Sequence, residues 1–155
     1  MDTINKAQKS IDELVIFRAR TLLFAALSLG LWQFGWLAMD MVEDSSVLFQ
    51  SMGWMSVIGA VLWVIAIFLI LKFNREMKRA NSCSALHDEL TVKNRNISFF
   101  NSYIILFGLI WVLIPLLDHF KLDAYFAMRL IAIVAIILPM VFFSVAELSI
   151  DEATE

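Results

Sequence analysis

The chain has 155 residues, of which 61% are hydrophobic and 17% are charged. An ordinary soluble domain has about 45–50% apolar and about 25% charged residues, so this composition excludes a typical soluble fold. The formal net charge of −3 is too small to indicate an acidic or a basic partner, and nucleic-acid binding is not expected.

Four long stretches without charged residues occupy most of the chain. They are bounded by Arg20 and Asp40, Asp44 and Lys72, Arg95 and Asp118, and Arg129 and Glu147. At roughly 17 to 27 residues, each can cross the hydrocarbon core of a bilayer once as a helix. Membrane β-barrels show alternating segments instead, and these stretches are continuously apolar. We predict one all-α integral membrane domain, residues 1–155, folded as a four-helix bundle of two hairpins with spans at residues 21–40, 52–73, 98–117 and 124–147.

The basic residues alternate between the two sides of the predicted membrane. Ten of the twelve lysines and arginines precede the first span or lie between the second and third; they are Lys6, Lys9, Arg18, Arg20, Lys72, Arg75, Lys78, Arg79, Lys93 and Arg95. By the positive-inside rule, both termini and residues 74–97 are cytoplasmic. The short loops at residues 40–53 and 118–123 then face outward.

Residues 1–20 form a predicted cytoplasmic amphipathic segment. Ser10 and Glu13 have the spacing of a capping box, which predicts a helix that begins at Ser10 and continues as the first span. A weak apolar stripe upstream of Arg18 favours a tail that lies along the membrane surface. We expect the first span to be a retained anchor, because acidic residues precede it and no small-residue cleavage site follows. Residues 148–155 form an acidic cytoplasmic tail.

Residues 74–97 form the longest polar stretch and are predicted to be a short cytoplasmic helical connector between the hairpins. Its charged residues are candidates for contact with a partner protein; they are Arg75, Arg79, His87, Asp88 and Glu89.

Polar residues within predicted spans are costly, and they often have a function. Arg129 lies about 9 Å inside the fourth span, and its side chain points toward the outer surface. It can pair with Asp40 or with Asp118, or it can bind an anion or a lipid headgroup. Gln33 is uncharged and can hydrogen-bond between helices.

Small residues favour close packing of the first hairpin or a dimer. Ala26 and Gly30 are four residues apart on the first span, and Ser56, Gly59 and Ala60 form a small-residue face on the second. Trp111 lies in the middle of the third span, and we expect its indole N–H to find an acceptor between helices.

No motif indicates catalysis, a cofactor or a metal. Glycine-rich phosphate loops, nucleophile elbows and the His-Glu-x-x-His pattern are missing from the sequence. Cys83 and His87, and separately Asp118, His119 and Asp123, supply too few ligands at defined spacing for a predicted zinc site. We therefore expect neither an enzyme nor a cofactor protein.

The sequence favours a non-catalytic accessory subunit, assembly factor or regulator of a membrane complex, in contact with lipid and with a membrane-protein partner or with copies of itself. A small homo-oligomeric transporter or channel is the alternative, with Gln33, Asp40, Asp118 and Arg129 lining the outer half of a path. A second alternative is a lipid-binding protein that uses Arg129 and Trp36. The expected location is the bacterial inner membrane.

Overall fold

The computed structural model describes residues 2–42, 44, 46–79, 89–120 and 123–152, and it omits the side chains of 2–12, 78–79, 89–90, 118, 120 and 150–152. The described chain is helical almost throughout. The helices are α1 (Asp2–Met39), α2 (Val47–Arg79), α3 (Glu89–Phe120) and α4 (Ala124–Glu152). All four contain a segment long and apolar enough to cross a membrane, which confirms the predicted all-α class and the number of candidate spans.

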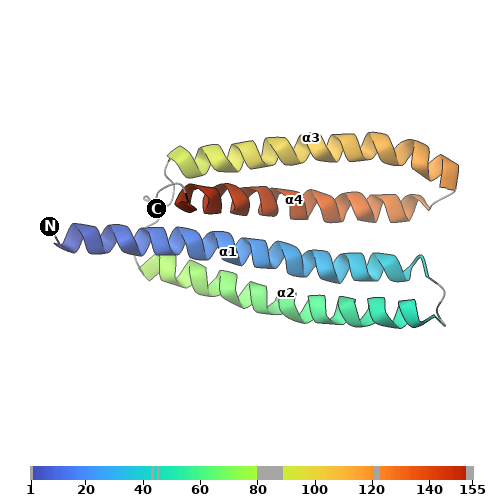
Figure 1. Ribbon diagram of the computed structural model, residues 1–155, viewed down its shortest axis with the longest axis horizontal. Helices are drawn as coiled ribbons and strands as arrows, with labels where there is room; N and C mark the ends of the chain where they lie inside the picture. Colours follow the sequence, from blue (N-terminus) through green and yellow to red (C-terminus); the bar gives the residue numbers. More distant parts are fainter. Residues whose placement is uncertain (1, 43, 45, 80–88, 121–122, 153–155) are drawn as a thin grey trace.

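The helices lie side by side in the order α2, α1, α4, α3 (Figure 1). α1 contacts α2 and α4, and α3 contacts α4. No Cα pair within 8 Å joins α2 to α3 among the described residues. The predicted hairpins are therefore present, but they form an open layer instead of a closed four-helix bundle. Within the described residues, only α4 of the second hairpin contacts the first hairpin, and it does so through α1. α2 and α3 are therefore left at opposite edges of the layer.

The hairpins give the layer two distinct ends (Figure 1). We name the end at which α1 passes to α2, and α3 to α4, the short-loop end. α1 begins and α4 ends at the opposite end, which we name the terminal end.

α1 begins well before the predicted start at Ser10 and runs without interruption to Met39. The capping-box prediction was wrong in this respect, because residues 2–29 contain neither glycine nor proline to interrupt the i to i−4 hydrogen bonds. The N-terminal segment therefore continues the axis of α1 and forms no separate surface helix (Figure 1).

α2 begins at Val47, so the helix extends beyond the span predicted at residues 52–73. The Ser46 hydroxyl accepts a hydrogen bond from the Phe49 backbone N–H at 3.0 Å, which is the geometry of a helix N-cap. A serine directly before an apolar run is an N-cap signal that can be recognised in the sequence. α2 also continues to Arg79, and α3 begins at Glu89, so both ends of the predicted connector are helical.

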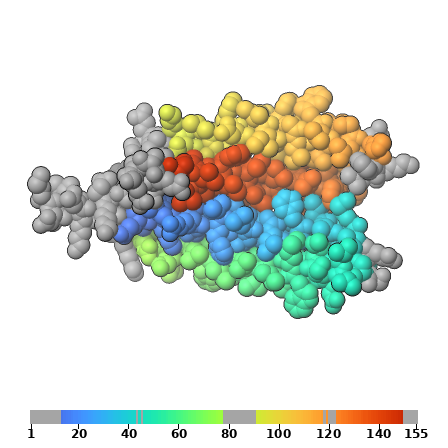
Figure 2. Space-filling view, in the orientation of Figure 1, coloured from blue at the N-terminus to red at the C-terminus, as the bar shows by residue number. Residues whose placement is uncertain are grey.

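Most of the buried apolar residues among the described side chains belong to α1, which contacts both α2 and α4. They are Leu14, Ala19, Ala25, Ala26, Leu29 and Leu37. The edge helices α2 and α3 instead expose many large apolar side chains. In Figure 2 the side chains of α1 and α4 meet along the middle of the layer. So much exposed apolar surface is what a chain surrounded by lipid presents.

Candidate functional site

The α1–α2 interface is a close approach of two backbones. A Cβ atom placed on Gly59 of α2 would lie 2.3 Å from the backbone nitrogen of Trp32, and one on Gly35 of α1 would lie 3.0 Å from the nitrogen of Ser56. The Ser56 hydroxyl donates a hydrogen bond of 3.1 Å to the Trp32 carbonyl oxygen. Glycine at these two positions therefore brings the helices into direct contact.

An ion pair joins α1 to α4 at the short-loop end. Arg129 donates a hydrogen bond from Nη1 to the Oδ2 atom of Asp40 at 2.9 Å, and its guanidinium carbon lies 4.8 Å from the centre of the Trp36 ring. The Arg129 side chain is 17% exposed and that of Asp40 is 49% exposed. Of the partners considered from sequence, Arg129 contacts Asp40, and the side chain of Asp118 is not described.

A second ion pair joins the same two helices near the terminal end. Arg18 of α1 donates two hydrogen bonds to the carboxylate of Glu147 on α4, and the one from Nε measures 3.1 Å. Its guanidinium also lies 5.3 Å from the centre of the Phe143 ring. The side chain of Arg18 is 15% exposed and that of Glu147 is 2% exposed. Sequence reasoning missed this pair, because Arg18 was read only as a basic residue that precedes the first span and Glu147 only as the boundary of the fourth apolar stretch.

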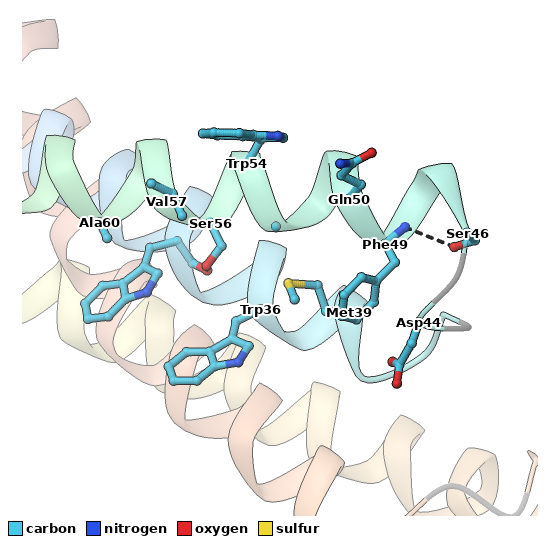
Figure 3. A pocket seen from close by; sticks show the side chains of 12 residues that line it. Trp36, Met39, Asp44, Ser46, Phe49, Gln50, Trp54, Ser56, Val57 and Ala60 are labelled. Carbon is cyan, nitrogen blue, oxygen red and sulfur yellow. Dashed lines mark hydrogen bonds between the residues drawn. The ribbon is translucent and has the colours of Figure 1, made fainter.

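A groove of about 770 Å³ lies between α1 and α2 at the short-loop end. Figure 3 shows Trp36 extending from α1 and Trp54 from α2, with Met39 between them. Gly53, whose missing side chain leaves Met39 accessible, also lines the groove. A cavity of this size lined by aromatic rings with a few polar groups is typical of a ligand site.

The two ends of this groove differ in polarity. Asp44 and Ser46 lie at the end nearest the loop, whereas Val57 and Ala60 lie at the other end (Figure 3). The separation of Ser46 and Ala60 along α2 corresponds to about 21 Å at 1.5 Å per residue. The groove is therefore elongated along the helix axis and amphipathic along its length.

One face of α3 points away from α4 and has no neighbour among the described residues. We name it the α3 outer face; its residues, all exposed, are Asn101, Ile104, Gly108, Trp111 and Pro115. They follow one another at intervals of three and four residues, which is the spacing of a helix-packing seam. Trp111 is 63% exposed, so the expected interhelical position for its indole was wrong within this chain.

The other predicted site residues do not gather into a common site. Gln33 on α1 is half-buried, and Arg75 on α2 is exposed. Asp118, Arg79 and Glu89 belong to helices whose backbone is described, but their side chains are not. His87 and Asp88 lie outside the described residues, as does Cys83.

Among the described residues, no group of three or more histidine, cysteine, aspartate or glutamate side chains is arranged to hold a metal ion. What the described part of the chain offers is a groove, two ion pairs between distant segments and an uncovered helix face. No family model, no curated protein and no solved structure matches this chain.

Proposed function

We propose that this chain is a non-catalytic, multi-pass membrane protein that acts as an accessory subunit, assembly factor or regulator by docking on another membrane protein. Both termini and the connector are cytoplasmic in this proposal, and the membrane is the bacterial inner membrane. The distribution of basic residues supports the orientation.

The α3 outer face is the observation that carries the proposal. Hydrocarbon chains offer no hydrogen-bond partner to an amide, and Asn101 is exposed on this face. None of the hydrogen bonds among the described residues involves its side chain. A Cβ atom placed on Gly108 would meet nothing within 4 Å. An asparagine and a glycine at equivalent seam positions suit an approaching helix better than they suit lipid.

The transporter alternative has less support. The described helices form a single layer, so one copy encloses no path between them. Arg129 and Asp40 neutralise each other at the short-loop end. A path would require further copies of the chain, and two of the charged residues proposed to line it, Asp40 and Arg129, are already paired with each other.

The test is extraction of the tagged chain from its native membranes in nanodiscs, followed by mass spectrometry and measurement of the native mass. We expect a stoichiometric membrane-protein partner that is retained by the wild type and lost from Gly108→Leu, because leucine fills the seam. Ala132→Leu is the matched control, since it adds similar bulk at an exposed position on α4.

A particle that contains only copies of this chain would contradict the accessory role. Retention of the partner by Gly108→Leu to the same extent as by Ala132→Leu would contradict the assignment to the α3 outer face. Flux in liposomes that disappears in Arg129→Ala would favour the transporter instead.

A further inference from the structure

The groove between α1 and α2 lies far from the α3 outer face, at the other edge of the layer, and docking through α3 gives it no role. We propose that it binds a membrane lipid whose headgroup ends in an ammonium group. The ammonium lies beside Asp44 and the indole rings, and an acyl chain follows the groove toward Ala60.

The shape of the groove matches such an occupant. Its one charged lining residue, Asp44, lies with Ser46 at the end beside the loop, and its other end is lined by Val57 and Ala60 (Figure 3). The Ser56 hydroxyl, near that other end, is already hydrogen-bonded to the Trp32 carbonyl oxygen. A length of about 21 Å along α2 is comparable with that of an extended acyl chain. A phospholipid has the same sequence of a polar head followed by an apolar chain, in the same direction relative to the membrane.

The charges select the class of headgroup. Asp44 is the one charged side chain among the described residues that line the groove. The nearby Arg129 is hydrogen-bonded to Asp40, so that pair adds no net charge at the mouth. The negative charge of Asp44 favours a cation and disfavours a headgroup whose only charge is a phosphate.

The tryptophans add to this preference. Trp32, Trp36 and Trp54 all line the groove, and indole faces attract ammonium groups. Arg129 already lies against the Trp36 ring, with its guanidinium carbon 4.8 Å from the ring centre. This contact holds Trp36 as one wall and leaves Trp32 and Trp54 for the ligand.

The floor of the groove allows a direct test. A Cβ atom placed on Gly53 would lie 3.7 Å from the sulfur of Met39, which is an ordinary contact. Gly53→Ala is therefore tolerated and leaves most of the space open, whereas Gly53→Leu fills the middle of the groove. The two variants form a matched pair at one position.

The experiment titrates the purified, delipidated full chain with phosphatidylethanolamine or phosphatidylglycerol of identical acyl chains and counts bound lipids by native mass spectrometry. We expect the wild type and Gly53→Ala to bind phosphatidylethanolamine about two- to fivefold more tightly than phosphatidylglycerol. Asp44→Asn removes that difference. Gly53→Leu loses the tightly bound lipid, and Ala132→Leu keeps it.

Equal affinity for the two lipids, or tighter binding of phosphatidylglycerol, would overturn the proposal, because the negative charge at the mouth would then have no effect on the headgroup. Unchanged binding by Gly53→Leu would overturn the location. If Gly53→Leu does not fold, Ala60→Leu blocks the apolar end, and its binding decides the same question. Since no partner protein is present, these outcomes are independent of the docking proposed for α3.

Discussion

α1 is held against its two neighbours by different forces. Toward α2 the contact depends on glycine and on one hydroxyl-to-carbonyl hydrogen bond, Ser56 to Trp32. Toward α4 there is an ion pair near each end of the interface: Arg18 pairs with Glu147, and Asp40, which directly follows α1, pairs with Arg129. The α1–α2 interface therefore relies on close backbone packing, whereas the α1–α4 interface combines packing with ion pairs.

The difference follows from how the helices are connected. α1 and α2 are joined by a short loop, so their pairing needs little beyond packing. α1 and α4 are far apart in sequence, and in a bilayer the hydrophobic effect does not bring helices together. Ion pairs fix the relative orientation and register of α1 and α4, which the packing of apolar helices alone leaves undetermined. Three variants test this comparison.

Loss of the ion pair near the terminal end should have the largest effect. Arg18→Met leaves the carboxylate of Glu147, whose side chain is 2% exposed, without its cation. Breaking such a buried pair costs about 3–5 kcal/mol in the free energy of unfolding. Unfolding of the purified protein in detergent, followed by circular dichroism as denaturant is added, measures this loss.

The double variant Arg18→Met with Glu147→Met is the control for that prediction. It removes both charges and replaces them with apolar side chains, so most of the stability should return. A double variant as unstable as Arg18→Met would mean that packing of the arginine, and not the uncompensated carboxylate, accounts for the loss.

Gly59→Ala tests the α1–α2 interface and should have an intermediate effect. The new methyl group would overlap the backbone of Trp32, so the helices must separate, at a cost of about 1–3 kcal/mol. Gly108→Ala is the matched control, because its Cβ atom enters open space and helix propensity alone favours it by about 0.5–1 kcal/mol. Equal stability of the two variants in the same denaturation assay would refute the close-approach argument.

Arg129→Ala should have the smallest effect of the three. Asp40 is 49% exposed and can be hydrated when its partner is removed, so the pair and the contact with Trp36 together contribute about 1 kcal/mol. The melting temperature in detergent gives the comparison with Arg18→Met. A loss as large as that of Arg18→Met would show that the two ends of the α1–α4 interface do not differ in the way that their burial indicates.

Much of the short-loop end could be predicted from the sequence. Arg129 stands out as a charge inside an apolar span, and the direction of helical side chains restricts its partners to the short-loop end. The Arg18–Glu147 pair could not be found in the same way. Arg18 precedes the first apolar stretch and Glu147 follows the fourth, and whether they meet depends on how α1 and α4 are rotated about their axes.

The groove was also beyond sequence reasoning. The positions of Trp36 and Trp54 along the chain indicate only their depth in a membrane. That both line one groove with Gly53 depends on the rotation of α1 against α2, which the backbone contact at Gly59 sets.

The sequence by itself determined four apolar helices, their pairing into two hairpins and the sides on which the basic residues gather. Length, hydropathy and charge are properties of position along the chain, and short loops make consecutive helices neighbours. Only the tertiary structure decided that α4, and not α3, packs against the first hairpin, and that the result is an open layer. The connector allows either arrangement, and the choice is made by contacts between α1 and α4, including two ion pairs, which no one-dimensional pattern contains.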